Sequence, residues 1–334
     1  MKSSAHIIGA GGIGIAAAAC LVRAGWDVTL IESNREKVDA GRRDEMMLNS
    51  LPIHGVDFVH FDEWTPPKEA AVLLCTKTFD NAPILQRIAN TETLVPIQNG
   101  YDKDLERSRH PAEAIASFVS ECPPDRPSAR ITRVGSLHIG LRRKASSDEV
   151  ERVDMLASAL ARGKLFPVER VVDIGPFKST KLMYNSAISP LAASAGVDNA
   201  QLLIDPPTQK LFFALLKENY SILRHAGLTL EKIGPFHPDT VMHILQTPFL
   251  PKFMGLFFRP SLRGTYCSMS PDMGSGQTEI DAYNGHLVRL AGDFPCPINN
   301  AVINLVDRIS RQRLPKARTH LHHLVTSLPG GVLI

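Results

Sequence analysis

The protein has 334 residues, of which 44% are hydrophobic and 21% are charged, and its formal net charge is +3. This length suggests about two domains, and the composition is that of a globular protein. A charge this small, with Lys and Arg scattered along the chain, gives no indication of a nucleic-acid or membrane partner. Five cysteines without CxxC spacing, no apolar run of about 18 residues and no signal-peptide pattern predict a cytoplasmic protein with reduced thiols.

The start of the chain predicts a βαβ unit with a glycine-rich first turn. A short β-branched run precedes the pattern Gly9-x-Gly11-x-x-Gly14, and an alanine-rich helix and a second strand over 28–31 follow it. In such a turn the first glycine permits the bend, the second lets the backbone approach a pyrophosphate, and the third lets helix and strand pack closely. An acidic residue that ends the second strand reaches the ribose of NAD. The residues expected at a bound dinucleotide are Gly9, Ala10, Gly11, Gly12, Ile13, Gly14 and Glu32.

Two further strands are predicted over 70–77 and 93–100, and each ends in polar residues. In a doubly wound parallel sheet, ligands bind at the carboxyl ends of the strands. Lys77 and Asn99 stand at these ends, so we expect them beside the nicotinamide of the dinucleotide. For either residue alone, an ordinary strand end or turn is an equally good explanation, since Asn-Gly is a common turn dipeptide.

Alternating hydrophobicity over 115–143 predicts antiparallel strands that complete the sheet, around a proline-rich loop at 122–128. A short amphipathic helix is expected over 148–162. A strand follows within 166–177, where a Gly-Pro pair breaks the pattern.

The Gly-Pro pair marks the predicted domain boundary, because the pattern after it is helical almost throughout. We expect a doubly wound Rossmann-type sheet in residues 1–170 and a mainly helical domain in 175–334, which is an α/β fold class. The histidine-rich run at 320–324 is expected to be a surface helix end, and no metal site is predicted, since partner ligands at usable spacing are missing. Helices are predicted over 178–196, 207–227, 238–246, 278–292 and 297–312.

One of these helices carries a row of polar residues on a largely apolar surface. Lys181, Asn185 and Ser189 are spaced at i, i+4 and i+8, which places them within about 80° of arc on one helix face. A solvent-facing stripe would explain such a row when it is taken alone. A cation, an amide and a hydroxyl in one line would also suit the wall of a polar cleft.

A second polar cluster, which includes Ser268, precedes the helix predicted to start near Thr278. Glu279 lies in the first turn of that helix, where a carboxylate interacts favourably with the helix dipole. Asp281 is the better candidate for this role, since it is placed to complete a weak capping box with Thr278. Glu279 is therefore available for another role.

Together these segments resemble the ketopantoate reductase (2-dehydropantoate 2-reductase) family. The resemblance runs over nearly the whole chain and is carried by the GxGxxG unit, Lys77, the strand end "QNG", and the segments "KLMYNSAISPLAA" and "TEID". It implies that Lys181 is the catalytic lysine and that Glu279 works beside it. Ser189 departs from the family pattern, because a second asparagine is expected there, and the stretch 268–279 is slightly compressed. The residues expected at the substrate are Asn185, Ser189, Asn199 and Ser268, with Ser268 at its carboxylate, while Lys77 and Asn99 are expected near the nicotinamide and the reacting carbonyl.

The resemblance implies the reduction of a small branched 2-keto acid by hydride transfer from NAD(P)H, with ketopantoate as the leading substrate. Lys181 would be the general acid at the carbonyl oxygen, in an interdomain cleft walled also by residues 9–14, Asn99 and Glu279. Two alternatives remain open: a D-2-hydroxyacid dehydrogenase of the same fold, and a dinucleotide-binding regulatory protein without catalysis. A small molecule is the expected partner, and a homodimer is left open.

The choice of cofactor depends on the end of the second strand. Members of the family commonly use NADP, whereas Glu32 favours NAD, because a carboxylate repels a 2′-phosphate. Arg35 lies three residues further on and could bind such a phosphate if Glu32 turned away. We expect NAD.

Overall fold

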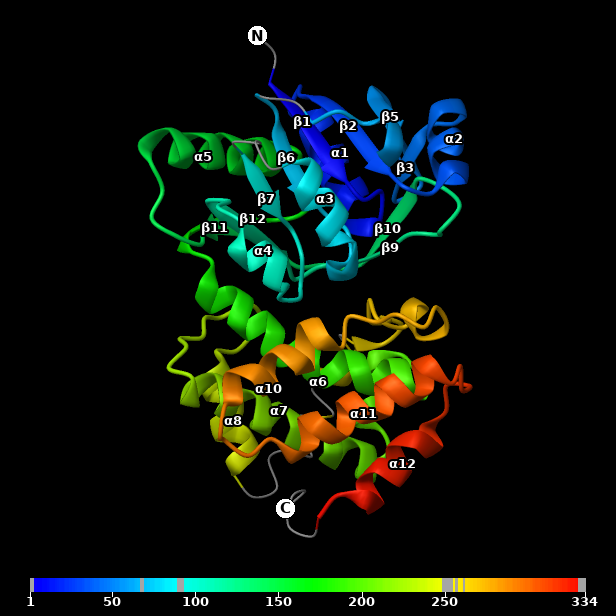
Figure 1. Ribbon diagram of the computed structural model, residues 1–334, viewed down its shortest axis with the longest axis vertical. Helices are drawn as coiled ribbons and strands as arrows, with labels where there is room; N and C mark the ends of the chain where they lie inside the picture. Colours follow the sequence, from blue (N-terminus) through cyan, green and yellow to red (C-terminus); the bar gives the residue numbers. More distant parts are fainter. Residues whose placement is uncertain are drawn as a thin grey trace. The chain divides into compact units, whose positions relative to one another are not determined.

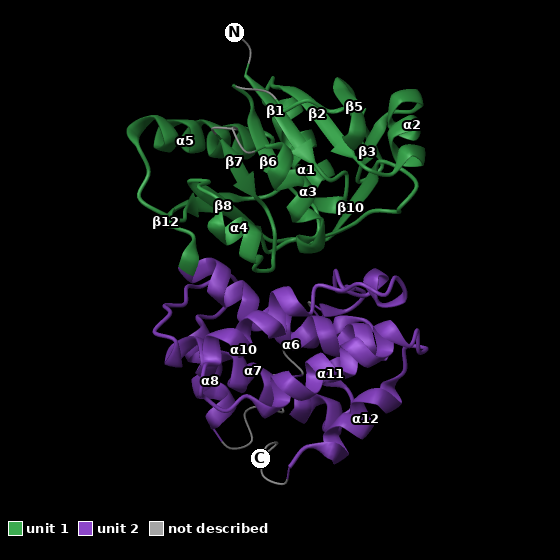
Figure 2. Cartoon of the chain, in the orientation of Figure 1, with its two compact units in different colours: residues 1–175 green, residues 176–334 purple. Residues whose placement is uncertain are grey.

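The computed structural model describes residues 3–66, 69–88, 93–247, 255, 258–260 and 262–329. The chain divides into two compact units, Met1–Gly175 and Pro176–Ile334 (Figure 2). The first unit is built around β-sheets and the second from helices, as Figure 1 shows. The predicted fold class, a Rossmann-type sheet followed by helices, is thereby confirmed.

A five-stranded parallel sheet forms the centre of unit 1. The strands of this unit are β1 (Ser4–Ile8), β2 (Asp27–Glu32), β3 (Met46–Leu48), β4 (Leu51–Ile53), β5 (Val56–His60), β6 (Ala71–Leu74), β7 (Leu94–Pro96), β8 (Ala112–Ala116), β9 (Val119–Glu121), β10 (Ser128–Arg133), β11 (Leu137–Leu141) and β12 (Val168–Asp173). The order in the central sheet is β5-β2-β1-β6-β7, so Ile8 of β1 pairs with Ile31 on one side and Leu74 on the other. The strand order reverses at β1, and doubly wound sheets bind ligands at the carboxyl end of such a switch point.

The strands predicted over 115–143 do not all complete that sheet, and this expectation was wrong in part. β11 lies between antiparallel β8 and parallel β12, while β10 lies between antiparallel β9 and parallel β3, in two further sheets. Within the described ranges, an isolated bridge between Ile97 and Ala114 continues β7 into β8. The pairing of β10 with β3 could not be foreseen, because β3 and β4 have three residues each, too few to show a period.

The helices of unit 1 pack closely because the first of them is built from small residues. They are α1 (Gly12–Arg23), α2 (Arg35–Arg43), α3 (Asn81–Arg87), α4 (Lys103–Arg107) and α5 (Ser147–Arg162). The alanines at 16–19 of α1 are buried, and this helix contacts α5 and β10. At the end of α5, a Cβ added to Gly163 would lie 2.4 Å from the Cα of Cys20. The start of α5 is fixed by a capping box between Ser146 and Glu149.

Unit 2 is helical in the part that the structure describes. It contains α6 (Gly175–Ala195), α7 (Pro206–His225), α8 (Pro238–Gln246), α10 (His286–Ala291), α11 (Pro297–Arg311) and α12 (Arg318–Ser327). α7 contacts α8, α10, α11 and α12, so it forms the centre of the unit. The helix predicted over 278–292 is instead a π-helical turn at Asp281–Gly285 followed directly by α10. Within α6, Pro190 lacks the N–H that would bond to the carbonyl of Ser186 four residues earlier.

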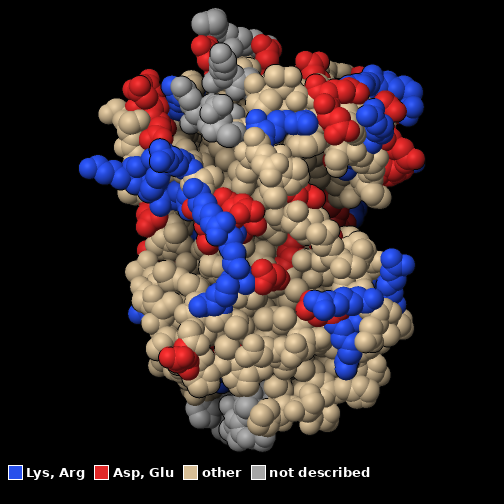
Figure 3. Space-filling model, in the orientation of Figure 1, with Lys and Arg blue, Asp and Glu red and all other residues tan. Residues whose placement is uncertain are grey.

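No helix in the described ranges is both long and apolar enough to cross a membrane. On the face drawn in Figure 3, Lys and Arg side chains lie among Asp and Glu side chains. Both signs of charge occur together on this face, in keeping with the net charge of +3.

Candidate functional site

The glycine turn joins β1 to α1, and its three glycines have different surroundings. Gly9 has a φ of +102°, a left-handed conformation that favours glycine. A Cβ at Gly14 would lie 2.0 Å from the carbonyl oxygen of Gly9, so strand end and helix start pack backbone against backbone. A Cβ at Gly11 would meet no heavy atom within 4 Å, which leaves open space in front of this backbone. The turn therefore fits a pyrophosphate, which needs close access to the amides at a helix N-terminus.

The carboxylate of Glu32 lies at the end of β2 and faces this turn. Its Oε2 accepts a hydrogen bond from the backbone N–H of Ala10 at 3.2 Å. Its Oε1 accepts the N–H groups of Ser33 at 2.7 Å and Asn34 at 3.1 Å. Arg35 points elsewhere, since its guanidinium pairs with Glu63 at 3.4 Å. Of these two charged side chains, Glu32 contacts the glycine turn and Arg35 does not.

A buried amide pair holds the carboxyl ends of β6 and β7 together. The side chain of Gln98 donates to the carbonyl of Thr76 at 2.9 Å and to Oδ1 of Asn81 at 2.8 Å, and Asn81 returns a bond of 3.1 Å. Lys77 and Asn99 adjoin these anchored residues in sequence, and both are half-buried. The pair therefore fixes the backbone from which the two predicted nicotinamide neighbours project.

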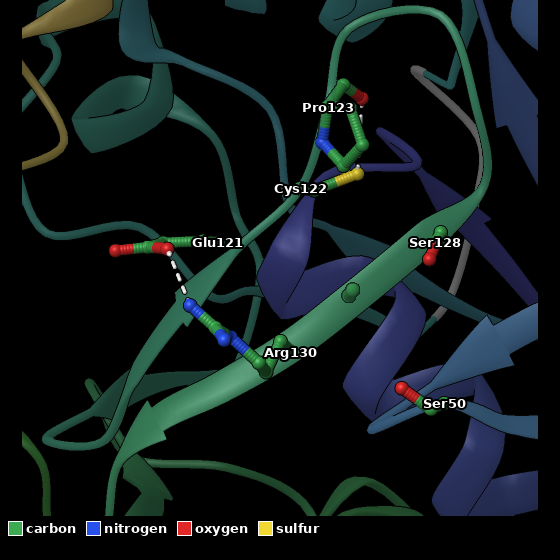
Figure 4. A pocket seen from close by; sticks show the side chains of 7 residues that line it. Ser50, Glu121, Cys122, Pro123, Ser128 and Arg130 are labelled. Carbon is green, nitrogen blue, oxygen red and sulfur yellow. Dashed lines mark hydrogen bonds and ion pairs between the residues drawn. The ribbon is translucent and has the colours of Figure 1, made fainter.

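A surface pocket lies close to the glycine turn (Figure 4). Cys122 connects the two, because its Sγ lies 3.6 Å from the carbonyl of Ala10 and accepts a 3.2 Å hydrogen bond from the buried ammonium of Lys37. Glu121 and Arg130 form an ion pair at 3.6 Å within the pocket. None of the site residues predicted from the sequence is among its lining residues, which are Ser50, Glu121, Cys122, Pro123, Ser128, Ala129 and Arg130.

In unit 2, the predicted polar row lies along α6 as a continuous helix. Lys181 and Asn185 are half-buried, and Ser189 is 4% exposed. Solvent-facing rows of a surface helix are more exposed than this. A simple solvated stripe therefore does not describe the row.

The segment 265–268 connects several of the residues predicted at the substrate. Asn199 donates two hydrogen bonds to Thr265. Its backbone N–H donates to the carbonyl of Thr265 at 3.0 Å, and its side-chain amide donates to Oγ1 of Thr265 at 3.1 Å. Two residues later, the thiol of Cys267 donates to the carbonyl of Ser189 at 3.4 Å. Ser268, the next residue, is exposed. Asn199, Ser189 and Ser268 are thereby tied to one short stretch of chain.

Tyr283 links this segment to Glu279. Its hydroxyl lies 3.5 Å from Oγ of Ser268 and 3.4 Å from Oε2 of Glu279. The ring is fully buried, and Glu279 is 5% exposed. Burial, together with the neighbouring charge of Glu279, raises the pKa of Tyr283 well above its ordinary value. The phenol therefore stays protonated and can donate to the carboxylate.

Asp281 does not play the part that the sequence predicted. The π-helical turn has no side-chain cap, and Thr278 accepts the N–H of Ile280 instead of that of Asp281. The carboxylate of Asp281 pairs with Arg289 at 2.6 Å. The capping box is therefore wrong, because a π-helical turn displaces the N–H groups that an α-helical start would present.

Basic residues also surround the start of α10. Burial, with the charges of Arg289 and Lys178, lowers the pKa of His286 to about 4, so this imidazole is neutral near pH 7. Lys178, three residues before Lys181, is itself 5% exposed.

The histidines of the run 320–324 lie on α12, and two of them have partners in the structure. His320 bonds to the carbonyl of Pro315 and His322 to Asp205, each at 2.9 Å. In the part of the chain that the structure describes, no group of three or more His, Cys, Asp or Glu side chains is placed to hold a metal ion.

Sequence reasoning did not find Gln98, Thr265 or Tyr283. Gln98 stands in the quoted "QNG", and Tyr283 follows Glu279 at i+4, a spacing that brings two side chains together on a helix. Thr265 carries no such signal, because its partner Asn199 is 66 residues away in the chain.

The glycine turn offers a matched pair of substitutions. Gly14→Ala should lower the free energy of unfolding by about 1–3 kcal/mol or more, since its Cβ would collide with backbone that cannot rotate away. Gly11→Ala should leave stability within about 0.5 kcal/mol, because its Cβ enters open space, yet weaken dinucleotide binding. Urea unfolding and dinucleotide titration would check both. Equal stability losses would contradict this account of the turn.

Two family models match the chain. The model described as "Ketopantoate reductase PanE/ApbA" matches residues 5–138, and the one described as "Ketopantoate reductase PanE/ApbA C terminal" matches residues 173–310. A curated relative, 2-dehydropantoate 2-reductase from Aquifex aeolicus (strain VF5), is 24% identical over 313 residues, which are 90% of this chain and 94% of the relative.

Solved structures of other proteins share the fold of this chain. A PanE/ApbA family ketopantoate reductase from Ralstonia eutropha JMP134 has a TM-score of 0.73 at 21% identity, covering 93% of this chain and 100% of the other. D-mandelate dehydrogenase, solved with NADH and anilino(oxo)acetate, has a TM-score of 0.72 at 19% identity, covering 96% and 99%. The glycine turn, the polar row on α6 and both family models lead to one conclusion: the chain belongs to the ketopantoate reductase family of oxidoreductases.

Proposed function

We propose that the protein reduces a branched 2-keto acid to the 2-hydroxy acid with a nicotinamide dinucleotide, and that ketopantoate is its leading substrate. The observation that carries the proposal is the set of contacts by which the segment 265–268 connects the predicted substrate residues of unit 2. The glycine turn of unit 1, open in front of Gly11, would hold the dinucleotide pyrophosphate.

Lys181 is the proposed general acid. When bound, the nicotinamide supplies a hydride to the carbonyl carbon, and the carbonyl oxygen must then receive a proton. The ammonium of Lys181 would donate that proton and stabilise the negative charge that develops on the oxygen. A carboxylate near an ammonium favours its charged form, so Glu279 would keep Lys181 protonated. Asn185, one turn further along α6, would orient the ammonium.

Asn199 supports a substrate that carries a hydroxyl. Thr265 donates its hydroxyl hydrogen to the carbonyl of Leu262 at 2.7 Å, so its Oγ1 can only accept from Asn199, and this fixes which end of the amide faces Thr265. Oδ1 of Asn199 is then a buried acceptor without a hydrogen-bond partner in the described structure. A buried acceptor of this kind requires a donor, which the hydroxyl of ketopantoate would supply. Ser268 would bind the substrate carboxylate.

A D-2-hydroxyacid dehydrogenase is the second candidate function, and Ser189 is the observation that favours it. A serine has a shorter hydrogen-bonding arm than the asparagine that the family pattern leads one to expect, so it leaves more room beside Asn185. The similar fold of D-mandelate dehydrogenase is compatible with a bulkier substrate. A third possibility, dinucleotide binding without turnover, gives no reason for a buried Glu279 on the unit that carries Lys181.

For the cofactor, we propose NAD. Three backbone N–H groups hold the Glu32 carboxylate at the glycine turn, and Arg35 is engaged with Glu63. A carboxylate in this place would accept hydrogen bonds from the ribose hydroxyls and repel a 2′-phosphate.

The first prediction concerns Lys181. Lys181→Ala should lower kcat for ketopantoate by about 100-fold or more, the range of positioned acid catalysis. Lys210→Ala, which removes an exposed lysine from α7 of the same unit, should change kcat by less than about twofold. Nicotinamide absorbance with a panel of 2-keto acids measures both. An unchanged kcat in Lys181→Ala would exclude the lysine as the acid, and a larger kcat/KM for aryl keto acids would favour the dehydrogenase.

The second prediction concerns Asn199. Asn199→Ala should raise KM for ketopantoate about tenfold, the loss expected for one hydrogen bond to a buried acceptor. The same keto acid without its hydroxyl should show little change in KM, since it has no donor for Oδ1. Steady-state kinetics with the two substrates provide the comparison. A similar loss for both would mean that Asn199 supports the fold and does not recognise the hydroxyl.

The third prediction concerns Glu32. The wild type should prefer NADH over NADPH by at least about tenfold in kcat/KM, or about 1.4 kcal/mol. Glu32→Ser should reduce this preference, while Glu36→Ser, an exposed carboxylate on α2, should preserve it despite the same change in net charge. A preference for NADPH that survives Glu32→Ser would show that Glu32 does not read the ribose.

A further inference from the structure

Pro190 leaves one backbone carbonyl in the middle of α6 without its usual hydrogen-bond donor. Because proline has no N–H, the carbonyl of Ser186 lacks the donor that a helix normally provides four residues later. Ser186 is fully buried, so water cannot easily take the place of this donor. The side-chain amide of Asn284, in the π-helical turn Asp281–Gly285, donates to this carbonyl at 2.9 Å. The π-helical turn therefore supplies the hydrogen-bond donor that α6 lacks at the carbonyl of Ser186.

The orientation of the Asn284 amide is fixed by a chain of acceptors. The carboxylate of Glu218 accepts the side-chain amide of Asn299 at 2.8 Å, so Oδ1 of Asn299 faces Asn284 and accepts its amide at 2.8 Å. The second N–H of Asn284 then goes to Ser186. Oδ1 of Asn284 has no partner in the described structure, although it is buried. Both N–H groups of the Asn284 side chain therefore make hydrogen bonds, while its Oδ1 does not.

The π-helical turn also carries the carboxylate that the proposed mechanism needs. The carbonyl of Glu279 accepts the N–H groups of Ala282 at 3.0 Å and Tyr283 at 3.1 Å, which makes Glu279 continuous with the turn. Glu279 precedes Asn284 by five residues, and Lys181 precedes Ser186 by five residues. The bond between Asn284 and Ser186 consequently joins the segment of the carboxylate to the helix of the lysine.

We propose that Asn284 is a positioning residue, which clamps the π-helical turn, and with it Glu279, to α6 at the carbonyl that Pro190 leaves without a helical donor. This rests on the proposed roles of Lys181 and Glu279. A one-ångström displacement of a group near the reacting atoms can cost about 100-fold in rate, so a clamp on the carboxylate segment acts on catalysis without touching substrate.

The first test replaces the donor. Asn284→Asp keeps the shape of the side chain but presents acceptors to the Ser186 carbonyl and to Asn299, and Asn284→Ala removes the side chain. Both should lower kcat about tenfold or more with a smaller change in KM. Hydrogen exchange, read by mass spectrometry, should become about tenfold faster at amides 280–285. Thr208→Val is the control: this buried hydroxyl at the start of α7 donates to the carboxylate of Asp205 at 2.7 Å, so the variant loses a buried hydrogen bond outside the chain of amides that orients Asn284, and kcat should change by less than about twofold.

The second test restores the missing donor. Pro190→Ala supplies an N–H to Ser186, so the double variant Pro190→Ala/Asn284→Ala should regain much of the thermal stability lost in Asn284→Ala. It should not regain kcat or slow exchange at 280–285, because the two elements are still unclamped. Recovery of kcat together with stability would overturn the proposal and leave Asn284 a purely structural role. Exchange at 280–285 that is unchanged in Asn284→Ala would overturn it as well.

These outcomes are separable from a failure of the proposed function. If the wild type turns over no 2-keto acid, the reaction assignment is wrong, and the exchange and stability measurements, made without substrate, still decide whether Asn284 clamps the turn. If turnover is found and exchange does not respond to Asn284, the clamp alone fails.

Discussion

The half-buried carboxylate of Glu218 makes the hydrogen bonds on which the interior of unit 2 depends. It accepts the backbone N–H groups of Ile298 at 3.0 Å and Asn299 at 2.7 Å, so a side chain of α7 caps the start of α11. Burial raises the pKa of Glu218, while these N–H donors oppose the rise. Since a carboxylate offers acceptors alone, it also dictates how Asn299, and through it Asn284, must face. One charge on α7 thereby orients amides that reach as far as α6.

In unit 1, the backbone of the glycine turn is held in place by close steric contacts. Gly14 and Gly9 touch backbone to backbone, and Gly12 is so close to β9 that a Cβ would lie 2.8 Å from the carbonyl oxygen of Ser120. Such contacts have no adjustable side chain, so the turn can take few shapes. Polar groups complete the arrangement at its rim, where Glu32 holds Ala10 and Gln98 holds Thr76. Rigid backbone with a polar rim suits a ligand that is recognised largely by backbone amides.

The sequence predicted α6, α7, α11 and the central strands β1, β2, β6 and β7, because these elements have clear periods or strong punctuation. It did not predict the fifth central strand, β5, nor α2, β3, β4 or the π-helical turn. Three-residue strands show no period, and a π-helical turn differs from an α-helix by hydrogen bonds that no local pattern encodes. The site residues could likewise be predicted only where they form a pattern within one element. The spacing along one helix was enough to predict the polar row of Lys181, Asn185 and Ser189. The contact of Thr265 with Asn199 joins segments that are far apart in the sequence, so no local pattern predicts it.

The π-helical turn at Asp281–Gly285 has a consequence for how the chain tolerates change in length. The N–H of Gly285 bonds to the carbonyl of Ile280, five residues back, so this turn holds one residue more than an α-helical turn would. If one residue of the turn were deleted, α10 would extend toward the N-terminus as a regular α-helix. The residues before the deletion would then be rotated by about 100° around the helix axis. Glu279 would then leave Tyr283, its partner at 3.4 Å. The five residues therefore act as a spacer, and their number, together with the side chain of Asn284, sets the direction in which the carboxylate points.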